Sequence, residues 1–481
     1  MPALAPKVFL VQPPSPPRKN VFREWAGGMG TAQPSERAVA GHDQRYYDIP
    51  WSQFLWIARG LEQRGIAVEY ADLQATPIYD AAAFEQRLLE LRPAVLISVA
   101  NLPSLSFDLE LLARWRRLVP GLRVVLLGPA ARLDPTRAFT ADAADYVMEA
   151  NEELVVPELC AEILRDPTGV QPDSCWHRAG AEVVRAPQRQ VIRDLDFVDF
   201  PAYHLLDVAR YESDFFLGRR YRYMTVYTSK GCSYDCCYCP YPFGFGSKIL
   251  FRSPAKVVDD IERLHREFGV EQICFRDQVF TVRKKHVEAI CQQLIERKLD
   301  VVWICETRYD LVTPELLQLM ARAGCREIHY GLETGDPELF ATIGKPGGPR
   351  SLARFEEAIA WTKAAGLRVH LHTILGLPGE SWKTVRSSLE FLRRTRPHSV
   401  QTAILSPYPG TPLFEQLKAQ GKLAPVDIEE YGGFQAVQPT EHMSVAELQR
   451  AKEYLGWNWD KSAWDKIVFK ARRWLGLGAR S

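Results

Sequence analysis

Short apolar segments alternate with amphipathic helical segments along most of this chain, and the alternation limits the folds that it can adopt. In the first part of the chain the expected strands are residues 7–12, 67–70, 94–99, 124–127 and 145–148. Helical periodicity marks residues 51–64, 84–91 and 109–118 between them. Strands that are separated by a helix pair in parallel within one sheet. The sequence therefore predicts a doubly wound parallel sheet over residues 1–165.

A second series of the same kind follows. Its expected strands are residues 223–228, 272–275, 301–305, 327–330, 368–375 and 400–405, and its expected helices are residues 254–268, 284–297, 314–323, 351–365 and 382–395. Six strand–helix repeats predict a partial (βα)6, TIM-like barrel over residues 215–420, with functional groups at the carboxyl ends of the strands. Residues 166–214 are expected to be a linker, whose segment 195–201 lies across a neighbouring surface. Residues 421–481 are expected to form a helical C-terminal region. The fold class is thus α/β, with a Rossmann-like sheet before the barrel.

The charge balance and the apolar runs exclude several classes of protein. The chain has 60 Lys and Arg against 59 Asp and Glu, a net charge of +1. A chain so balanced has no broad basic surface, so we expect no nucleic-acid partner. No apolar run reaches the roughly 20 residues that span a bilayer, and the first residues lack the pattern of a signal peptide. We therefore expect a cytoplasmic protein, in which the scattered cysteines are small buried hydrophobic residues.

Four of the ten cysteines lie within residues 232–239, directly after the first strand of the second series. Cys232, Cys236 and Cys239 have the spacing C-x3-C-x2-C, with Tyr238 before the last. Three thiolates can each bind one iron of a cuboidal iron–sulfur cluster, which is ordinarily held by four, so one iron would stay open to a small ligand. A structural zinc site would need a fourth ligand, and the sequence has no second cysteine or histidine pair of that kind. Zinc and a chance grouping of buried cysteines are the less favoured alternatives.

This segment resembles the cluster-binding motif of the radical S-adenosylmethionine (SAM) superfamily, C-x3-C-x-aromatic-C. The resemblance implies that Cys232, Cys236 and Cys239 hold a [4Fe-4S] cluster and that Tyr238 lies beside the adenine of SAM. In this superfamily SAM chelates the open iron, and an electron from the cluster cleaves it to methionine and a 5′-deoxyadenosyl radical, which abstracts hydrogen from the substrate. An electron donor such as flavodoxin or ferredoxin is implied as a partner. Cys237 does not fit the ligand spacing.

Four strand-end residues extend the resemblance along the second series. It implies that Asp277 lies near the amino group of SAM, although Arg276 departs from the family's second acidic residue there. Arg308 is expected to meet the carboxylate of SAM and Glu333 its ribose hydroxyls. Gly376 would allow the backbone to approach the adenine. The alternatives are a structural ion pair for Arg308 and Glu333, and an ordinary turn for Gly376.

The N-terminal sheet resembles the cobalamin (B12)-binding domain that precedes the barrel in one group of radical SAM enzymes. The segments that carry this resemblance are residues 11–15, 96–99, 125–129 and 145–153. The crevice at the carboxyl ends of the strands would be flanked by Ser98, Asn101, Gly128 and Asn151. No D-x-H-x-x-G follows the first strand, so no histidine is offered as a lower ligand of cobalt. Gly128-Pro129 and Glu149-Ala150 also replace the usual glycine steps. A domain that keeps the shape without the cofactor is therefore the alternative.

Together these features predict a radical SAM enzyme that modifies an unactivated carbon of a small or lipid-like metabolite, by cobalamin-dependent methyl transfer or by ring formation or rearrangement. A tRNA methylthiotransferase of the same superfamily and a non-catalytic iron–sulfur or cobalamin carrier are the alternatives. Residues 463–475 place Trp464, Ile467 and Trp474 on one helical face and basic residues on the other. Such a helix can make a peripheral contact with a membrane. The alternative is that it caps the barrel.

Overall fold

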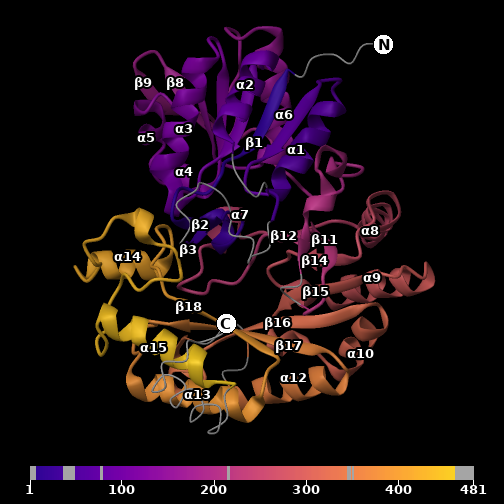
Figure 1. Ribbon diagram of the computed structural model, residues 1–481, viewed down its shortest axis with the longest axis vertical. Coiled ribbons are helices and arrows are strands. Elements are labelled where there is room, and N and C mark those ends of the chain that lie inside the picture. The colour runs from indigo at the N-terminus through magenta and orange to yellow at the C-terminus, as the bar shows by residue number, and fades with distance from the viewer. Residues whose placement is uncertain are drawn as a thin grey trace, which may run out of the picture.

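The computed structural model describes residues 7–35, 49–75, 80–213, 217–343, 348 and 351–460. Two sheets of seven strands each organise these residues. The N-terminal sheet and its helices form the upper part of the molecule in Figure 1, and the second sheet with its outer helices forms the lower part. Both predicted α/β units are therefore present.

The N-terminal sheet is mostly parallel. Its strands, in spatial order, are β4 (Val68–Asp72), β1 (Val8–Gln12), β5 (Val95–Val99), β6 (Arg123–Leu127), β7 (Tyr146–Met148), β8 (Cys175–Ala179) and β9 (Glu182–Arg185). The five strands from β4 to β7 are parallel. The pairing of β8 with β7 and of β9 with β8 is antiparallel. These last two strands lie in the segment that we expected to be a linker, because a short hairpin needs no crossover helix and so lacks the strand–helix pattern.

Side chains of the N-terminal sheet alternate between two apolar cores. Val8 and Leu10 of β1 pack with α1 (Ser52–Glu62) and α6 (Glu152–Arg165) on one face. Phe9 and Val11 pack with α2 (Ala81–Leu91) and α3 (Leu105–Leu118) on the other. Successive residues of a strand point to opposite faces, so an uninterrupted apolar strand requires helices on both sides of the sheet. This is the doubly wound arrangement that the sequence predicts.

The second sheet is an open half-barrel. Its strands, in spatial order, are β10 (Glu212–Ser213), β11 (Tyr221–Val226), β14 (Gln272–Phe275), β15 (Val302–Thr307), β16 (Cys325–Glu333), β17 (Arg368–Leu375) and β18 (Ser399–Ile404). The six from β11 to β18 are parallel. Outside them lie α8 (Pro254–Phe268), α9 (Lys284–Glu296), α10 (Pro314–Arg322), α12 (Leu352–Ala364) and α13 (Trp382–Thr395), as Figure 1 shows. The predicted partial barrel is thereby confirmed.

The segment 195–201 lies where the sequence analysis expected it, against a neighbouring surface. Leu195 and Val198 are buried beside Trp56 of α1. The guanidinium of Arg252 donates hydrogen bonds to the carbonyl oxygens of Leu195 (2.8 Å) and Val198 (3.0 Å). It also forms a fully buried ion pair with Asp260 of α8. This arginine therefore ties the segment between the two sheets to the half-barrel.

A hairpin that the sequence analysis did not predict lies between the two units. Strands β2 (Lys19–Phe22) and β3 (Thr31–Pro34) are antiparallel, and Figure 1 places them between the two sheets. The amide of Ala32 donates to the carbonyl oxygen of Gly432 at 2.9 Å. Trp25, between the strands, lies 6.3 Å from Phe434 by ring centroids. An early segment of the chain thus contacts a late one at the mouth of the half-barrel.

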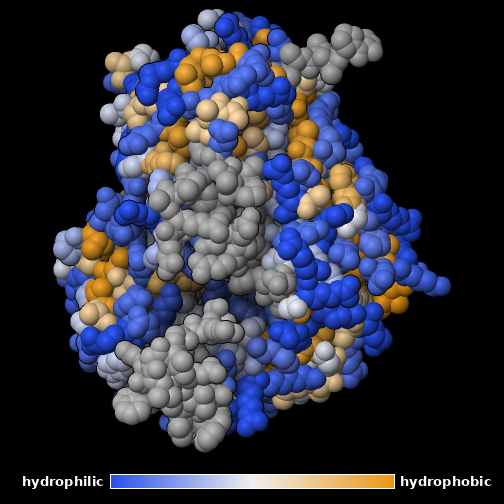
Figure 2. Space-filling model, in the orientation of Figure 1, coloured by the Kyte–Doolittle hydropathy of each residue, from blue (hydrophilic) through white to orange (hydrophobic). Residues whose placement is uncertain are grey.

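The C-terminal region contains α14 (Pro412–Ala419) and α15 (Val445–Asn458). The side chains of Leu448, Ala451 and Leu455 bury one face of α15 in the core of the half-barrel. The amphipathic helix expected over residues 463–475 lies outside the described residues. None of the described helices combines the length and the apolar character needed to cross a membrane. On the face shown in Figure 2, hydrophobic residues lie scattered among hydrophilic ones.

Candidate functional site

The cysteine loop begins directly after β11 and is anchored by Asp277. The carboxylate of Asp277 accepts hydrogen bonds from the Thr228 amide (3.1 Å), the Thr228 hydroxyl (2.7 Å) and the Ser229 hydroxyl (2.6 Å). Asp277 is 2% exposed and does not line the cavity described below. We expected this carboxylate near the amino group of SAM. Three donors fix it at the base of the loop, and its contact with SAM stays a prediction.

The three motif cysteines lie together on this loop. Burial raises the pKa of Cys239 to about 12, and Cys236 and Cys232 add to the effect. A thiol of this kind stays protonated unless a metal centre stabilises its thiolate. Among the described residues, a single ion could be shared by one group of three ligand atoms, and that group consists of histidines. The preference for an iron–sulfur cluster over zinc therefore rests on the C-x3-C-x2-C sequence spacing and on the lack of a second ligand pair.

The remaining cysteines have structural surroundings. The carbonyl oxygen of Cys237 accepts a hydrogen bond from the Leu413 amide at 3.0 Å, and burial raises the pKa of its thiol. All six cysteines outside the loop are buried and free of disulfides. This agrees with their prediction as small hydrophobic residues.

A cavity of about 270 Å³ connects the cysteine loop, the interior of the half-barrel and the β2–β3 hairpin. Trp25 and Thr31 line it from the hairpin, and Tyr238 and Cys239 from the cysteine loop. The half-barrel contributes mainly polar side chains, which are Arg276, Glu306, His329, Glu333, His370, His372, Thr373 and Gln401. Strand ends, loop and N-terminal segment thus enclose one space, as expected for the ligand site of a parallel barrel.

Tyr238 and Glu333 meet in this cavity. Burial and the hydrogen bond with Glu333 hold the pKa of Tyr238 well above its usual value. Glu333 has a φ of 64°, which places a residue with a side chain in the left-handed region. The pairing of β16 with β17 also shifts register between Gly331 and Glu333. An irregular strand end of this kind re-aims a side chain. It presents the Glu333 carboxylate to the cavity, where ribose hydroxyls could donate to it.

Arg308 forms a structural ion pair and also lies beside the cysteine loop, while its contact with SAM stays a prediction. Its Nε and Nη2 atoms bond both carboxylate oxygens of Asp310, at 3.0 and 2.9 Å. Its guanidinium carbon also lies 4.0 Å from the ring centroid of Tyr234, on the cysteine loop. Its Nη1 atom is buried without a hydrogen-bond partner among the described residues. A buried donor without a partner is rare, so this nitrogen beside the cysteine loop fits the carboxylate of a bound ligand.

Gly376 forms a turn at the end of β17. Its φ is +86°, a conformation that L side chains rarely adopt, and the nearest atoms to an added Cβ are apolar carbons at 3.5 to 3.8 Å. The turn therefore requires glycine through its backbone conformation, and the protein itself does not crowd the position. The Gly376 amide donates to Glu380, whose pKa burial raises to about 7. The predicted contact with adenine stays a prediction.

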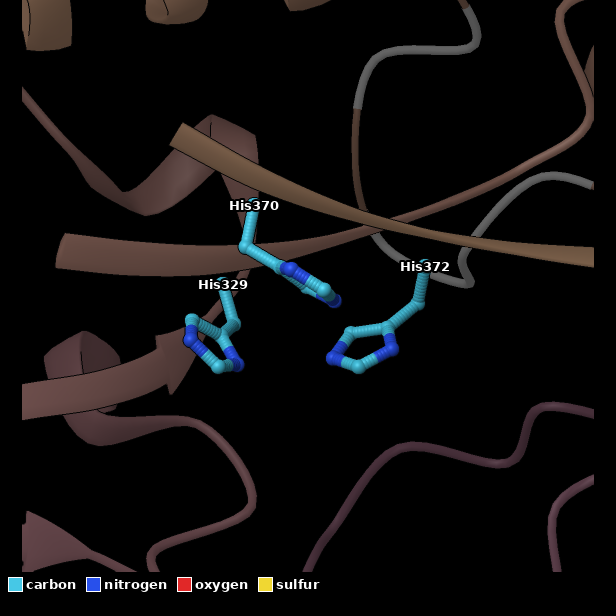
Figure 3. Close-up of side chains that lie close together, drawn as sticks. All are labelled: His329, His370 and His372. Atoms are coloured by element: carbon cyan, nitrogen blue, oxygen red, sulfur yellow. The ribbon is translucent and has the colours of Figure 1, made fainter. Parts of the chain in front are cut away.

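Three histidines, which the sequence analysis did not single out, lie together in the half-barrel. His329 of β16 pairs in register with His370 of β17, and His372 follows two residues later on the same face. Ring centroids are 4.4 Å apart for His329 and His370, and 4.6 Å for His370 and His372. Figure 3 shows the three rings grouped on one side of the two strands. Burial and the neighbouring His329 hold the pKa of His370 well below its usual value, so its ring is neutral.

The residues expected to flank a cobalamin crevice are engaged within the chain. The Ser98 hydroxyl donates to the carbonyl oxygen of Val11 at 3.0 Å. The Asn101 amide donates to the carbonyl oxygens of Arg23 and Gly28, at 2.8 and 2.7 Å. An added Cβ on Gly128 would lie 2.5 Å from the Ala100 carbonyl oxygen, and the Asn151 side chain accepts from the Ile192 amide at 3.0 Å. Each of these four residues therefore has a packing or hydrogen-bonding role within the chain, and their place beside a cofactor stays a prediction.

Comparison with known proteins identifies the family. Residues 226–392 match the model of the Radical SAM superfamily, and this stretch contains the cysteine loop and the strands β14 to β17. This stretch of the chain belongs to the radical SAM superfamily. A [4Fe-4S] cluster and SAM are the cofactors of this superfamily, so the prediction of these two cofactors is confirmed. The assignment of Cys232, Cys236 and Cys239 as the cluster ligands stays a prediction. As a radical SAM enzyme, the chain also requires a reductant.

Individual relatives extend the likeness beyond the barrel. An uncharacterised methyltransferase of Pyrococcus horikoshii is 26% identical over 330 residues, which cover 68% of this radical SAM enzyme and 70% of the relative. An anaerobic magnesium-protoporphyrin IX monomethyl ester cyclase of Cereibacter sphaeroides is 27% identical over 362 residues, covering 74% and 57%. The chain thus spans little more than half of that cyclase.

A solved structure shows the same fold over both units. The radical SAM methyltransferase TsrM of Kitasatospora setae, with cobalamin and a [4Fe-4S] cluster bound, superposes with a TM-score of 0.66 at 18% identity. The match covers 93% of this chain and 81% of TsrM. The N-terminal sheet and the half-barrel are therefore joined as in a cobalamin-containing radical SAM enzyme.

Proposed function

We propose that this radical SAM enzyme transfers a methyl group to an unactivated carbon of a small or lipid-like metabolite. The observation that carries the proposal is the cavity, because it joins the cysteine loop, the polar interior of the half-barrel and the N-terminal unit in one space. The names of the Pyrococcus relative and of TsrM support methyl transfer. The name of the Cereibacter relative supports ring formation as a second candidate on the same site.

The residues of the cavity would have different roles in the reaction. When bound, the cluster and SAM supply a 5′-deoxyadenosyl radical, which removes a hydrogen atom from the substrate. Cys232, Cys236 and Cys239 would hold the cluster, while Glu333 and the Nη1 atom of Arg308 would fix opposite ends of SAM. Arg276 and Glu306, 3.4 Å apart, lie across the cavity and would orient a polar part of the substrate. Trp25 and Phe434 line the cavity, where they would limit the access of water to the reacting groups. The reductant that we propose is a flavodoxin or a ferredoxin.

Cobalamin is the second cofactor that this proposal includes, and the N-terminal unit does not present an open crevice for it at Asn101. Residues 23–29 lie against Asn101 and Leu102 there, since Asn101 donates to the carbonyl oxygens of Arg23 and Gly28, and the Leu102 amide donates to that of Met29. An added Cβ on Gly28 would lie 3.0 Å from Trp51 and 3.2 Å from Pro129. A buried ion pair between Arg23 and Asp108, with atoms 2.9 Å apart, holds the segment in place. The segment would have to move to admit a corrin at this edge, so no step of the reaction is derived through cobalamin.

Anaerobic reconstitution tests the proposed function. We expect the protein with cluster and SAM to release 5′-deoxyadenosine when a strong reductant is added. Binding of hydroxocobalamin would require the segment over Asn101 to move, and we expect the bound cofactor to survive gel filtration with a base-off spectrum, because no lower histidine ligand is evident. Cleavage of SAM without retention of cobalamin would contradict the methyl-transfer proposal and leave a radical SAM enzyme of another kind. Absence of both SAM cleavage and the cluster absorbance would contradict the whole assignment.

A further inference from the structure

The half-barrel contains three histidines that the radical chemistry described above does not use. His329, His370 and His372 each offer one ring nitrogen, and these three atoms lie within 4.8 Å of one another. We propose that they bind one divalent transition-metal ion of the zinc type in the wall of the cavity. The proposal concerns a site separate from the three cysteines.

The chemistry of the three ligands fits such an ion. Imidazole nitrogen is a common ligand of zinc, and catalytic zinc sites combine three protein ligands with one open position. Zinc–nitrogen bonds of about 2.0–2.1 Å in tetrahedral geometry place the nitrogens roughly 3.4 Å apart. The nitrogens therefore need to approach by no more than roughly 1.4 Å, which small side-chain rotations can provide.

The surroundings of the histidines resemble the outer shell of a metal site. The Nε2 atom of His329 donates to the Glu327 carboxylate at 2.9 Å, and Arg368 holds the other oxygen of Glu327 at 2.9 Å. The Nδ1 atom of His370 shares a hydrogen bond of 2.7 Å with the Ser399 hydroxyl. Metal-binding histidines almost always use their second nitrogen in this way, since the bond fixes the ring and its tautomer. Two of the three histidines thus already have this support.

The side chain of His370 gives a second indication of a ligand, which does not depend on the distances among the three histidines. Its Nε2 atom is buried without a hydrogen-bond partner among the described residues, and the residue is 8% exposed. A buried polar atom left in this state costs free energy. An ion between the rings would satisfy it. Because the three histidines also line the cavity, the open position of the ion would face Arg276 and Gln401. It would accept an anionic oxygen of the substrate there, a use that rests on the proposed function.

Zinc binding to the cluster-loaded protein tests the site. The protein is treated with a chelator resin, incubated anaerobically with Zn²⁺, desalted and analysed for zinc and iron. We expect one zinc per chain in addition to the iron of the cluster. His370→Ala and His372→Ala should each weaken zinc binding at least tenfold, and Glu327→Gln should weaken it 10- to 100-fold. All three should keep their iron. His177→Ala, at a half-buried position of β8 in the N-terminal sheet, is the control and should bind zinc normally.

Two results would overturn the site. One is the absence of zinc from protein that keeps its cluster, and the other is zinc content that His370→Ala leaves unchanged. X-ray absorption at the zinc edge adds a measurement that does not depend on the variants. A shell of nitrogen and oxygen supports the histidines, whereas sulfur neighbours would place the zinc on the cysteine loop and refute the proposal. Cleavage of SAM, measured on the same samples, reports separately on the proposed function.

Discussion

Glu333 adopts a backbone conformation that residues with side chains rarely adopt, at the point where β16 ends in the cavity. Strain of this kind costs about 1–3 kcal/mol and persists where the surroundings hold it. Here the register shift against β17 and the hydrogen bond with Tyr238 hold it. The result is a carboxylate that faces the ligand space beside the cysteine loop. Packing alone would not require a residue with a side chain to adopt a positive φ at this position.

Replacing Glu333 by Gln tests this role. The substitution keeps the size of the side chain but removes the charge, so hydrogen bonds from ribose hydroxyls become weaker. We expect the binding free energy of SAM to fall by about 1–3 kcal/mol, the range for hydrogen bonds to charged groups. Calorimetric titration of SAM into the cluster-loaded protein measures the change. Glu338→Gln, at an exposed position of α11 (Pro337–Ile343), is the control. Equal SAM affinities in the two variants would limit Glu333 to supporting Tyr238.

The four cysteines of the loop should respond differently to replacement by Ala. Loss of Cys232, Cys236 or Cys239 removes a cluster ligand, so each variant should lose the iron–sulfur absorbance or hold it unstably. Cys237→Ala should keep its iron, because the contact of Cys237 with Leu413 is made by the backbone. Iron content and visible spectra after anaerobic reconstitution distinguish these outcomes. A Cys237 variant as depleted as the other three would show that the ligands are wrongly assigned.

At the scale of the elements, the parallel strands and their helices could be predicted, whereas the hairpins could not. Apolar runs between segments of helical periodicity predict the strands β14 and β17. The β2–β3 hairpin mixes apolar and charged residues around three glycines, so it shows no clear strand alternation. It is stabilised by contacts with residues near 430 that its own sequence does not reveal. Tertiary contacts determine the conformation of such segments.

The candidate site, too, could be predicted only in part from the sequence. The cysteines are adjacent in sequence, and their spacing identifies them. The histidines meet only because His329 and His370 occupy the same register on neighbouring strands. Register depends on the packing of the folded sheet. Asp277 was assigned to SAM because its place in the chain suits that role, but the donors of Thr228 and Ser229 determine where its carboxylate lies.

The turn between β17 and α13 predicts a pH dependence of stability through Glu380. Burial raises the pKa of Glu380 from its ordinary value of 4.5 to about 7, so the folded state binds more protons than the unfolded state between these two values. Stability is therefore lost as the pH rises through this window. The loss amounts to about 3 kcal/mol above pH 7. Glu380→Gln keeps the oxygen that accepts from Gly376 and Thr384 but cannot ionise.

We expect Glu380→Gln to raise the free energy of unfolding relative to the parent protein at pH 8, by up to about 3 kcal/mol, and by little at pH 4.5. Denaturant titrations at several pH values measure the difference. A gain that is the same at every pH would show that Glu380 is not titrating in this window.

At the scale of the whole molecule, the two units are held together around the cavity by polar and aromatic contacts. Lys230 of the cysteine loop pairs with Glu153 of α6. Arg132 of the N-terminal unit donates to the carbonyl oxygens of Phe243 and Gly244, just beyond the cysteines. Trp25 stacks on Phe22 at 4.8 Å and approaches Phe434. The N-terminal unit therefore forms part of the wall around the cluster site.

Trp25→Ala should open this wall. Removing the indole leaves a gap between the hairpin and Phe434, so solvent and small chelators reach the cysteine loop more easily. We expect iron to be lost to an anaerobic chelator several-fold faster than from the parent protein, with the same initial iron content. Trp176→Ala, on β8 and away from the cavity, should lose iron at the parent rate. Identical rates in both variants would mean that Trp25 does not shield the site.

The bond between Ala32 and Gly432 also bears on how the chain matures during its synthesis. About 400 residues separate the two partners, so a ribosome that adds 5–20 residues per second makes the second roughly 20–80 s after the first. During this interval the N-terminal sheet can fold while the hairpin, with its buried Met29, still lacks its later neighbours. When Cys232, Cys236 and Cys239 emerge, the strands β14 to β18 and the segment around residue 432 have yet to be synthesised. Iron and sulfide that are delivered before residue 432 is synthesised would reach the cysteines through an open entrance. After residue 432 has joined the hairpin, the entrance is covered.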